Sequence, residues 1–122
     1  MTNALKEVLC NSLIHIDIGI KRFSGNEELY EKSLRQFLRN PYYAAILAGL
    51  KSGDVRGAER ASQDLKALSY NLGMVRLAKC CDELCSAIRE GKGLPDFAAQ
   101  ADEVSAVYGV MERCMKKAFP EG

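Results

Sequence analysis

The sequence has 122 residues, of which 48% are hydrophobic and 27% charged. This length and composition are typical of one globular domain with a single core and exclude a disordered chain. The 17 basic and 16 acidic residues give a net charge of +1. Nucleic-acid binders need a clustered basic excess, because neutralising phosphates supplies most of their affinity, and here the two signs are interspersed. We therefore expect no nucleic-acid partner.

Nothing in the sequence predicts a membrane or secreted location. Residues 1–7 lack the basic start and apolar run of a signal peptide, and the longest apolar stretch, residues 42–50, is too short to cross a bilayer. Five cysteines, an odd number, do not indicate a disulfide framework. The expected location is cytoplasmic.

Glycine and proline divide the chain into segments in which apolar residues recur at helical spacing. Two short helices are expected over residues 3–12 and 14–22. Asn26 is placed to cap a helix from residue 27 to about residue 40, which Pro41 must break or kink. Its apolar face consists of Tyr30, Leu34 and Phe37.

Longer helices are expected in the rest of the chain, over residues 42–52, 55–72 and 74–90. Asp54 is placed to cap the second of these, and Gly73 follows it where a left-handed cap is common. Its apolar stripe steps by three and four: Ala58, Ala61, Leu65, Leu68 and Leu72.

The helix over residues 74–90 carries a similar stripe (Leu77, Cys81, Leu84 and Ile88) and stops at Gly91. Asp96 is expected to cap a last long helix, whose inner side carries Phe97, Ala101, Val104, Tyr108, Met111 and Met115. The alternation typical of strands is absent, and the connections are short. The sequence therefore predicts one all-α domain over residues 1–122, an up-and-down four-helix bundle with one or two short extra N-terminal helices.

The helix over residues 55–72 also has an unusual outward face. At about 100° per residue, the side opposite Leu65 faces solvent. Gln63 lies in the middle of that side, and Ala67 is small enough to let another surface approach. Tyr70 is an aromatic residue at a position expected to face solvent. The complete set on this side is Arg56, Glu59, Arg60, Gln63, Ala67 and Tyr70, with Lys66 on the flank.

Residues 61–73, read as Ala-Ser-Gln-Asp-Leu-Lys-Ala-Leu-Ser-Tyr-Asn-Leu-Gly, resemble the signature helix of histidine-containing phosphotransfer (HPt) domains. That helix carries Ala-x-His-x-Leu-Lys-Gly followed by small residues and Asn-Leu-Gly. The resemblance extends over residues 14–92 and is carried outside the signature helix by Ile16, Asp17, residues 23–26, Tyr30, Leu34, Phe37, Leu77, Cys81, Leu84, Arg89 and Gly91. It implies a helical bundle that acts in a two-component phosphorelay.

The sequence departs from this family at the position that carries the family's chemistry. Gln63 stands where the family has its phospho-accepting histidine, and Ala67 where it has glycine. Neutral imidazole is nucleophilic near neutral pH, whereas an amide nitrogen is delocalised into its carbonyl. Gln63 can therefore hydrogen-bond but cannot accept a phosphoryl group. Lys66 resembles the family lysine that balances the charge of the phosphate.

These observations predict a docking module without enzymatic activity, cofactor or metal, whose partner is a response-regulator receiver domain or a histidine kinase. One alternative is an authentic phosphotransfer protein in which glutamine has replaced the histidine, naturally or by design. Another is a structural or oligomerising bundle with no relay role. Tyr70, Tyr42 and Tyr43 should line an exposed patch if partners dock, and should pack inside if they do not. The partner and the oligomeric state stay open.

Other residues with possible chemistry have ordinary explanations. His15, the only histidine and the only other imidazole acceptor, is expected to be half-buried and away from the signature helix. Cys80, Cys81 and Cys85 could approach Cys114, but buried thiols are a commoner reading than a zinc site. The role of Cys10 stays open. Solvation and the helix dipole explain the acidic pairs, which are Asp82 and Glu83, Asp102 and Glu103, and Glu27 and Glu28.

Overall fold

The computed structural model describes residues 1–10, 14–91 and 94–120. These residues form seven α-helices and one short 3-10 helix and contain no strand, so the all-α prediction is confirmed. The elements are α1 (Asn3–Cys10), α2 (Ile16–Arg22), α3 (Glu27–Arg35), η1 (Phe37–Arg39), α4 (Tyr42–Ser52), α5 (Val55–Asn71), α6 (Val75–Glu90) and α7 (Leu94–Ala118). None of the helices within the described ranges has both the length and the apolarity needed to cross a bilayer.

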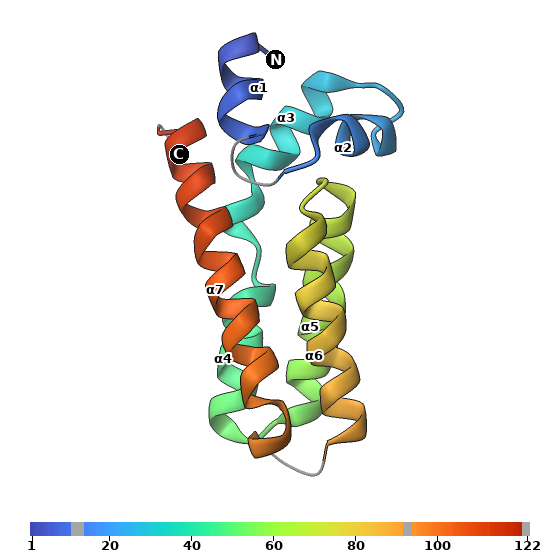
Figure 1. Ribbon diagram of the computed structural model, residues 1–122, viewed down its shortest axis with the longest axis vertical. Helices are drawn as coiled ribbons and strands as arrows, with labels where there is room; N and C mark the ends of the chain where they lie inside the picture. The colour runs from blue at the N-terminus through green and yellow to red at the C-terminus, as the bar shows by residue number, and fades with distance from the viewer. Residues whose placement is uncertain (11–13, 92–93, 121–122) are drawn as a thin grey trace.

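The four longer helices, α4 to α7, pack as a bundle, and α1 to α3 gather at one end of it (Figure 1). Helix α5 packs closely on both α4 and α6, and α6 packs on α7. Two ion pairs show that α5 and α6 run antiparallel, because the earlier residue Glu59 pairs with the later Arg89, and Lys66 pairs with Asp82. The predicted bundle-like packing is therefore present.

One continuous core joins the bundle to the short helices at its end. Tyr30, Leu34 and Phe37 are buried with Leu65 of α5 and Leu84 of α6. The apolar faces predicted from helical spacing account for most of this core. The residues of these faces that are buried in the bundle are Ala58, Ala61, Leu65, Leu72, Leu77, Cys81, Leu84, Ile88, Phe97, Val104, Tyr108, Met111 and Met115.

The buried stripe of α5 differs from the predicted one at three positions. Leu68 is only partly buried, whereas Ser62 and Ser69 are fully buried. Since α5 lies between α4 and α6, its covered face is wider than a single stripe and includes these two small residues. The Ser62 hydroxyl stays satisfied by donating to the carbonyl oxygen of Ala58 at 2.8 Å.

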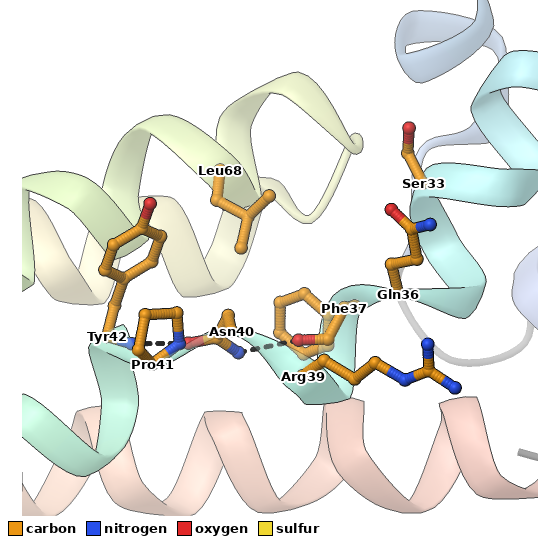
Figure 2. Close-up of a pocket in the computed structure, with 8 residues that line it drawn as sticks. All are labelled: Ser33, Gln36, Phe37, Arg39, Asn40, Pro41, Tyr42 and Leu68. Carbon is orange, nitrogen blue, oxygen red and sulfur yellow. Dashed lines mark hydrogen bonds between the residues drawn. The ribbon is translucent and has the colours of Figure 1, made fainter.

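The chain breaks between α3 and α4 earlier than expected. Helix α3 ends at Arg35, a 3-10 turn follows, and Asn40 then adopts an extended conformation before Pro41. The Asn40 amide donates to the Phe37 carbonyl oxygen at 2.7 Å and accepts from the Tyr42 backbone at 2.9 Å, as Figure 2 shows. Because of this break, three short helices precede the bundle, not one or two. These helices, α1 to α3, form the end group, to which Tyr30 and Leu34 belong.

Other predicted boundaries shift by a few residues. Helix α1 ends at Cys10, and residues 11 and 12 of the helix predicted there lie outside the described residues. Helix α2 begins at Ile16 and not at residue 14. Helix α7 begins at Leu94, so Asp96 lies inside its first turn and is not its cap; Pro95 is tolerated there because first-turn amides need no intrahelical acceptor.

Gly73 joins the end group to the bundle. It ends α5 in the left-handed conformation, with φ of 79°, and the Met74 amide closes the cap by donating to the Ser69 carbonyl oxygen at 2.9 Å. The His15 amide donates to the Gly73 carbonyl oxygen at 2.8 Å. A β-carbon on Gly73 would collide with the His15 carbonyl oxygen. The position therefore requires glycine both for its backbone angle and for space.

We predict that Gly73→Ala destabilises the protein by about 3 kcal/mol or more, because it adds a backbone collision to the left-handed penalty of about 1–2 kcal/mol. Gly53→Ala is the matched control, since Gly53 has φ of 84° but open space around its β-position. It should cost only the left-handed penalty of about 1–2 kcal/mol. Urea unfolding of both variants measures the difference, and equal losses would contradict the close approach at Gly73.

Candidate functional site

The outward side of α5 carries the candidate site. Asp54 caps the helix by accepting a hydrogen bond from the Gly57 amide at 3.0 Å. Gln63, Ala67 and Tyr70 are exposed, and Tyr70 keeps 50% of its surface accessible. The predicted direction of Gln63 toward solvent is thus confirmed, while the docking role of this side stays a prediction.

A hollow of about 590 Å³ opens on this side between α5 and α6. Its lining residues are Gln63, Lys66, Ala67, Tyr70, Asn71 and Arg89. Two of them are cations, two carry amides and one carries a phenol, so most of the polar side-chain atoms of these residues can donate hydrogen bonds. Among the described residues that line it, none carries a carboxylate. Ala67, with a single methyl group, leaves room for an incoming side chain.

Ion pairs across the α5–α6 contact hold the two cations in place. Lys66 donates to Asp82 at 2.8 Å, and this hydrogen bond raises the pKa of Lys66 and lowers that of Asp82. The Arg89 Nε donates to Glu59 at 2.7 Å and lowers the pKa of the Glu59 carboxyl. Exposed pairs of this kind add little stability, but they orient the cations beside the hollow.

Glu59 differs from its predicted position on the docking face. Its side chain is only 12% exposed, because Arg89 and Arg56 both bind it, the second at 3.0 Å. It therefore serves to anchor two arginines and presents little surface of its own. Arg56 and Arg60 are exposed nearer the start of α5 and do not line the hollow. Gln63, Lys66, Ala67 and Tyr70 are the predicted residues that come together around it.

Arg22 of α2 is part of this site, although no sequence pattern indicated it. Its guanidinium carbon lies 3.3 Å from the centre of the Tyr70 ring, and its Nη1 donates to the Tyr70 carbonyl oxygen. The contact combines a cation–π interaction with a cation at the C-terminal end of a helix. Arg22 and Tyr70 are 48 residues apart, so no local spacing indicates the contact. Asn71 and Arg89 also complete the hollow, and only the resemblance had drawn attention to them.

His15 is placed differently from the prediction. Its side chain is exposed and not half-buried, since it precedes α2 at the N-cap position. Its backbone also contacts the end of the signature segment, through the hydrogen bond to Gly73. The imidazole therefore lies near the end of α5, but Gln63 is ten residues earlier, about 15 Å along the helix axis.

The cysteines of α6 are buried. Cys80, Cys81 and Cys85 are all inaccessible, and Cys114 is buried on α7. Burial raises the pKa of each thiol on α6, and that of Cys81 to about 12. Among the residues whose positions are described, no three histidine, cysteine or acidic side chains gather where they could hold a metal ion. The side chain of Cys10 lies outside the described residues.

A second hollow, of about 370 Å³, lies at the break before α4. Its lining residues are Ser33, Gln36, Phe37, Arg39, Asn40, Pro41, Tyr42 and Leu68 (Figure 2). Tyr42 is partly buried against the core here, and Tyr43 stacks on Tyr108 with ring centres 3.8 Å apart. Of the three tyrosines that were to distinguish docking from structural packing, only Tyr70 is exposed on the candidate site.

Comparison of the chain with protein-family models, with curated proteins and with solved structures finds no match to any of them.

We predict that Cys81 reacts slowly with a thiol reagent in the folded protein. Raising its pKa from 9.0 to about 12 lowers the thiolate fraction near neutral pH by about a thousandfold. Peptide mapping after Ellman's reagent, with guanidinium-unfolded protein as control, measures the protection. Because the folded pKa is the higher one, stability should fall as pH rises from 9 toward 12. Equal labelling of folded and unfolded protein would contradict the burial.

Proposed function

We propose that this protein is a degenerate HPt-like signalling module, which docks a receiver domain or a histidine kinase of a two-component phosphorelay without accepting phosphate. The observation that supports this most strongly is the exposure of Gln63, Ala67 and Tyr70 on one side of α5, beside a hollow that Lys66 also lines. These are the residues of the resemblance, and they share one accessible surface.

The side chains on this surface are suited to binding and not to phosphoryl transfer. An aromatic ring and charged groups around a hollow are typical of protein-binding sites, in which a few such residues supply most of the affinity. Gln63 occupies the family's acceptor position with an amide, which lacks a nucleophilic lone pair. Lys66 already balances the charge of Asp82 at 2.8 Å, so it does not depend on a phosphate for a partner.

The packing of Tyr42 and Tyr43 favours the second reading, a structural or oligomerising bundle. Both rings lie partly buried against the core, as expected if no partner used them. Tyr70 favours docking, because half of a large aromatic side chain stays in contact with water although α5 offers a buried face close by. We give Tyr70 more weight, since it alone lies on the side that carries the resemblance.

We predict that Tyr70→Ala weakens binding of a cognate receiver or kinase domain by about tenfold or more, as loss of a central aromatic residue does. Arg60→Glu should weaken it several-fold and change its salt dependence. Calorimetry against a panel of purified receiver and histidine-kinase domains measures both effects. Leu47→Ala and Arg113→Glu are matched controls, because both side chains are exposed on other helices. Absence of any binding, or equal effects of variants and controls, would remove the docking proposal.

We predict that Gln63→His accepts labelled phosphate from a phosphorylated receiver, whereas the parent protein does not. The substitution restores a nucleophilic imidazole at an exposed position next to Lys66. Acid-labile label on the variant identifies phosphohistidine, and the double variant with His15→Ala excludes the other imidazole. Labelling would show that only the nucleophile is missing, as expected for an authentic phosphotransfer protein with a replaced histidine. An unlabelled variant would show that the docking surface has diverged as well.

A further inference from the structure

We propose that α2 completes the docking surface, and that Arg22, Lys66 and Arg89 form a cationic rim beside the hollow and Tyr70 that binds an acidic segment of the partner protein. This inference rests on the proposed function and adds to it the chemistry of the partner and a second helix. The three cations come from three helices, α2, α5 and α6, so only the folded protein brings them to one surface.

The charged residues that line the hollow are both cations. Lys66 and Arg89 line it, whereas the carboxylates that orient them, Asp82 and Glu59, are not among its lining residues. Asp82 engages one hydrogen bond of an ammonium group with three donors, and Glu59 engages the Nε of a guanidinium with five. Each cation can therefore bind a further carboxylate while keeping its present partner.

Arg22 extends the surface from α5 to α2. Its guanidinium covers one face of the Tyr70 ring, which limits the motion of a side chain that is 50% exposed. Ile18 lies one turn earlier on the same side of α2 and is 38% exposed. An acidic segment that also carries an apolar side chain could thus contact the rim and Ile18 together. A rigid aromatic residue loses less entropy on binding than a mobile one.

The positive charge of the rim is local and does not come from a general excess of positive charge on the chain. The whole chain has a net charge of only +1, so an acidic ligand is not attracted equally to every surface. Lys21 provides the comparison, because it is exposed on α2 next to Arg22 and loses the same charge when replaced by alanine. A role of Arg22 beyond its charge must therefore appear as a difference between Arg22→Ala and Lys21→Ala.

The test is an NMR titration of the ¹⁵N-labelled full chain with a hexaglutamate peptide, which needs no knowledge of the natural partner. The shifts should concentrate on residues 63–71, Arg22 and Arg89, and a hexalysine peptide should leave them unchanged. Arg22→Ala should weaken the peptide affinity about fivefold more than Lys21→Ala does, and Arg22→Lys should be intermediate because it keeps the charge without the planar stacking. Shifts spread over other helices, or equal effects of Arg22→Ala and Lys21→Ala, would overturn the proposal.

The same variants separate this inference from the proposed function. If a receiver or kinase domain binds through Tyr70 but ignores Arg22→Ala and Arg22→Lys, the rim is wrong and the docking function stands. If hexaglutamate binds at the rim with the expected dependence on Arg22 while no relay domain binds, the rim is supported and the relay function is wrong. Thermal unfolding of each variant excludes loss of the fold as the cause.

Discussion

The packing of α5 between α4 and α6 is the constraint on which the rest of the structure depends. Small residues allow the close approach: a β-carbon on Gly49 of α4 would lie 2.9 Å from the Ala58 amide nitrogen, tighter than such contacts normally are. Ser62 fits the buried face because its hydroxyl is satisfied within the helix. With this side covered by two neighbours, the opposite side has to face solvent, and that is where Gln63, Ala67 and Tyr70 lie.

The features of the fold that the sequence predicted are those that depend on local spacing. Apolar residues at three- and four-residue steps located the inner faces of α5, α6 and α7, and the Asp54 cap followed from residue type. The boundaries were predicted less well where non-local contacts decide them. Asn40 ends the 3-10 turn η1 and precedes α4. Its amide donates to the Phe37 carbonyl oxygen and to the Tyr108 hydroxyl and accepts from the Tyr42 backbone, and Tyr108 is 68 residues away.

In the candidate site, too, the local features could be predicted from the sequence and the non-local contacts could not. The positions on α5 could be assigned from helix geometry and from the resemblance, because both act within one helix. The counter-ions could not be assigned from the sequence, because Lys66 pairs with Asp82, and Glu59 with Arg89, only after α5 and α6 pack antiparallel. Glu59 was expected to present its charge outward and is instead enclosed by two arginines. The contact of Arg22 with Tyr70 depends on the position of α2, which the Gly73 turn determines.

Because the contact of Arg22 with Tyr70 depends on the Gly73 turn, the stability of the end group also affects the shape of the candidate site. The turn after α5 is held from both sides, by the His15 amide on Gly73 and by the Tyr30 hydroxyl on the Leu72 carbonyl oxygen at 2.7 Å. Arg22 reaches Tyr70 from the helix that follows His15. A substitution that loosens the turn would therefore also release the aromatic ring of Tyr70. The exposed surface of α5 and the buried joint at its end are for this reason a single structural unit.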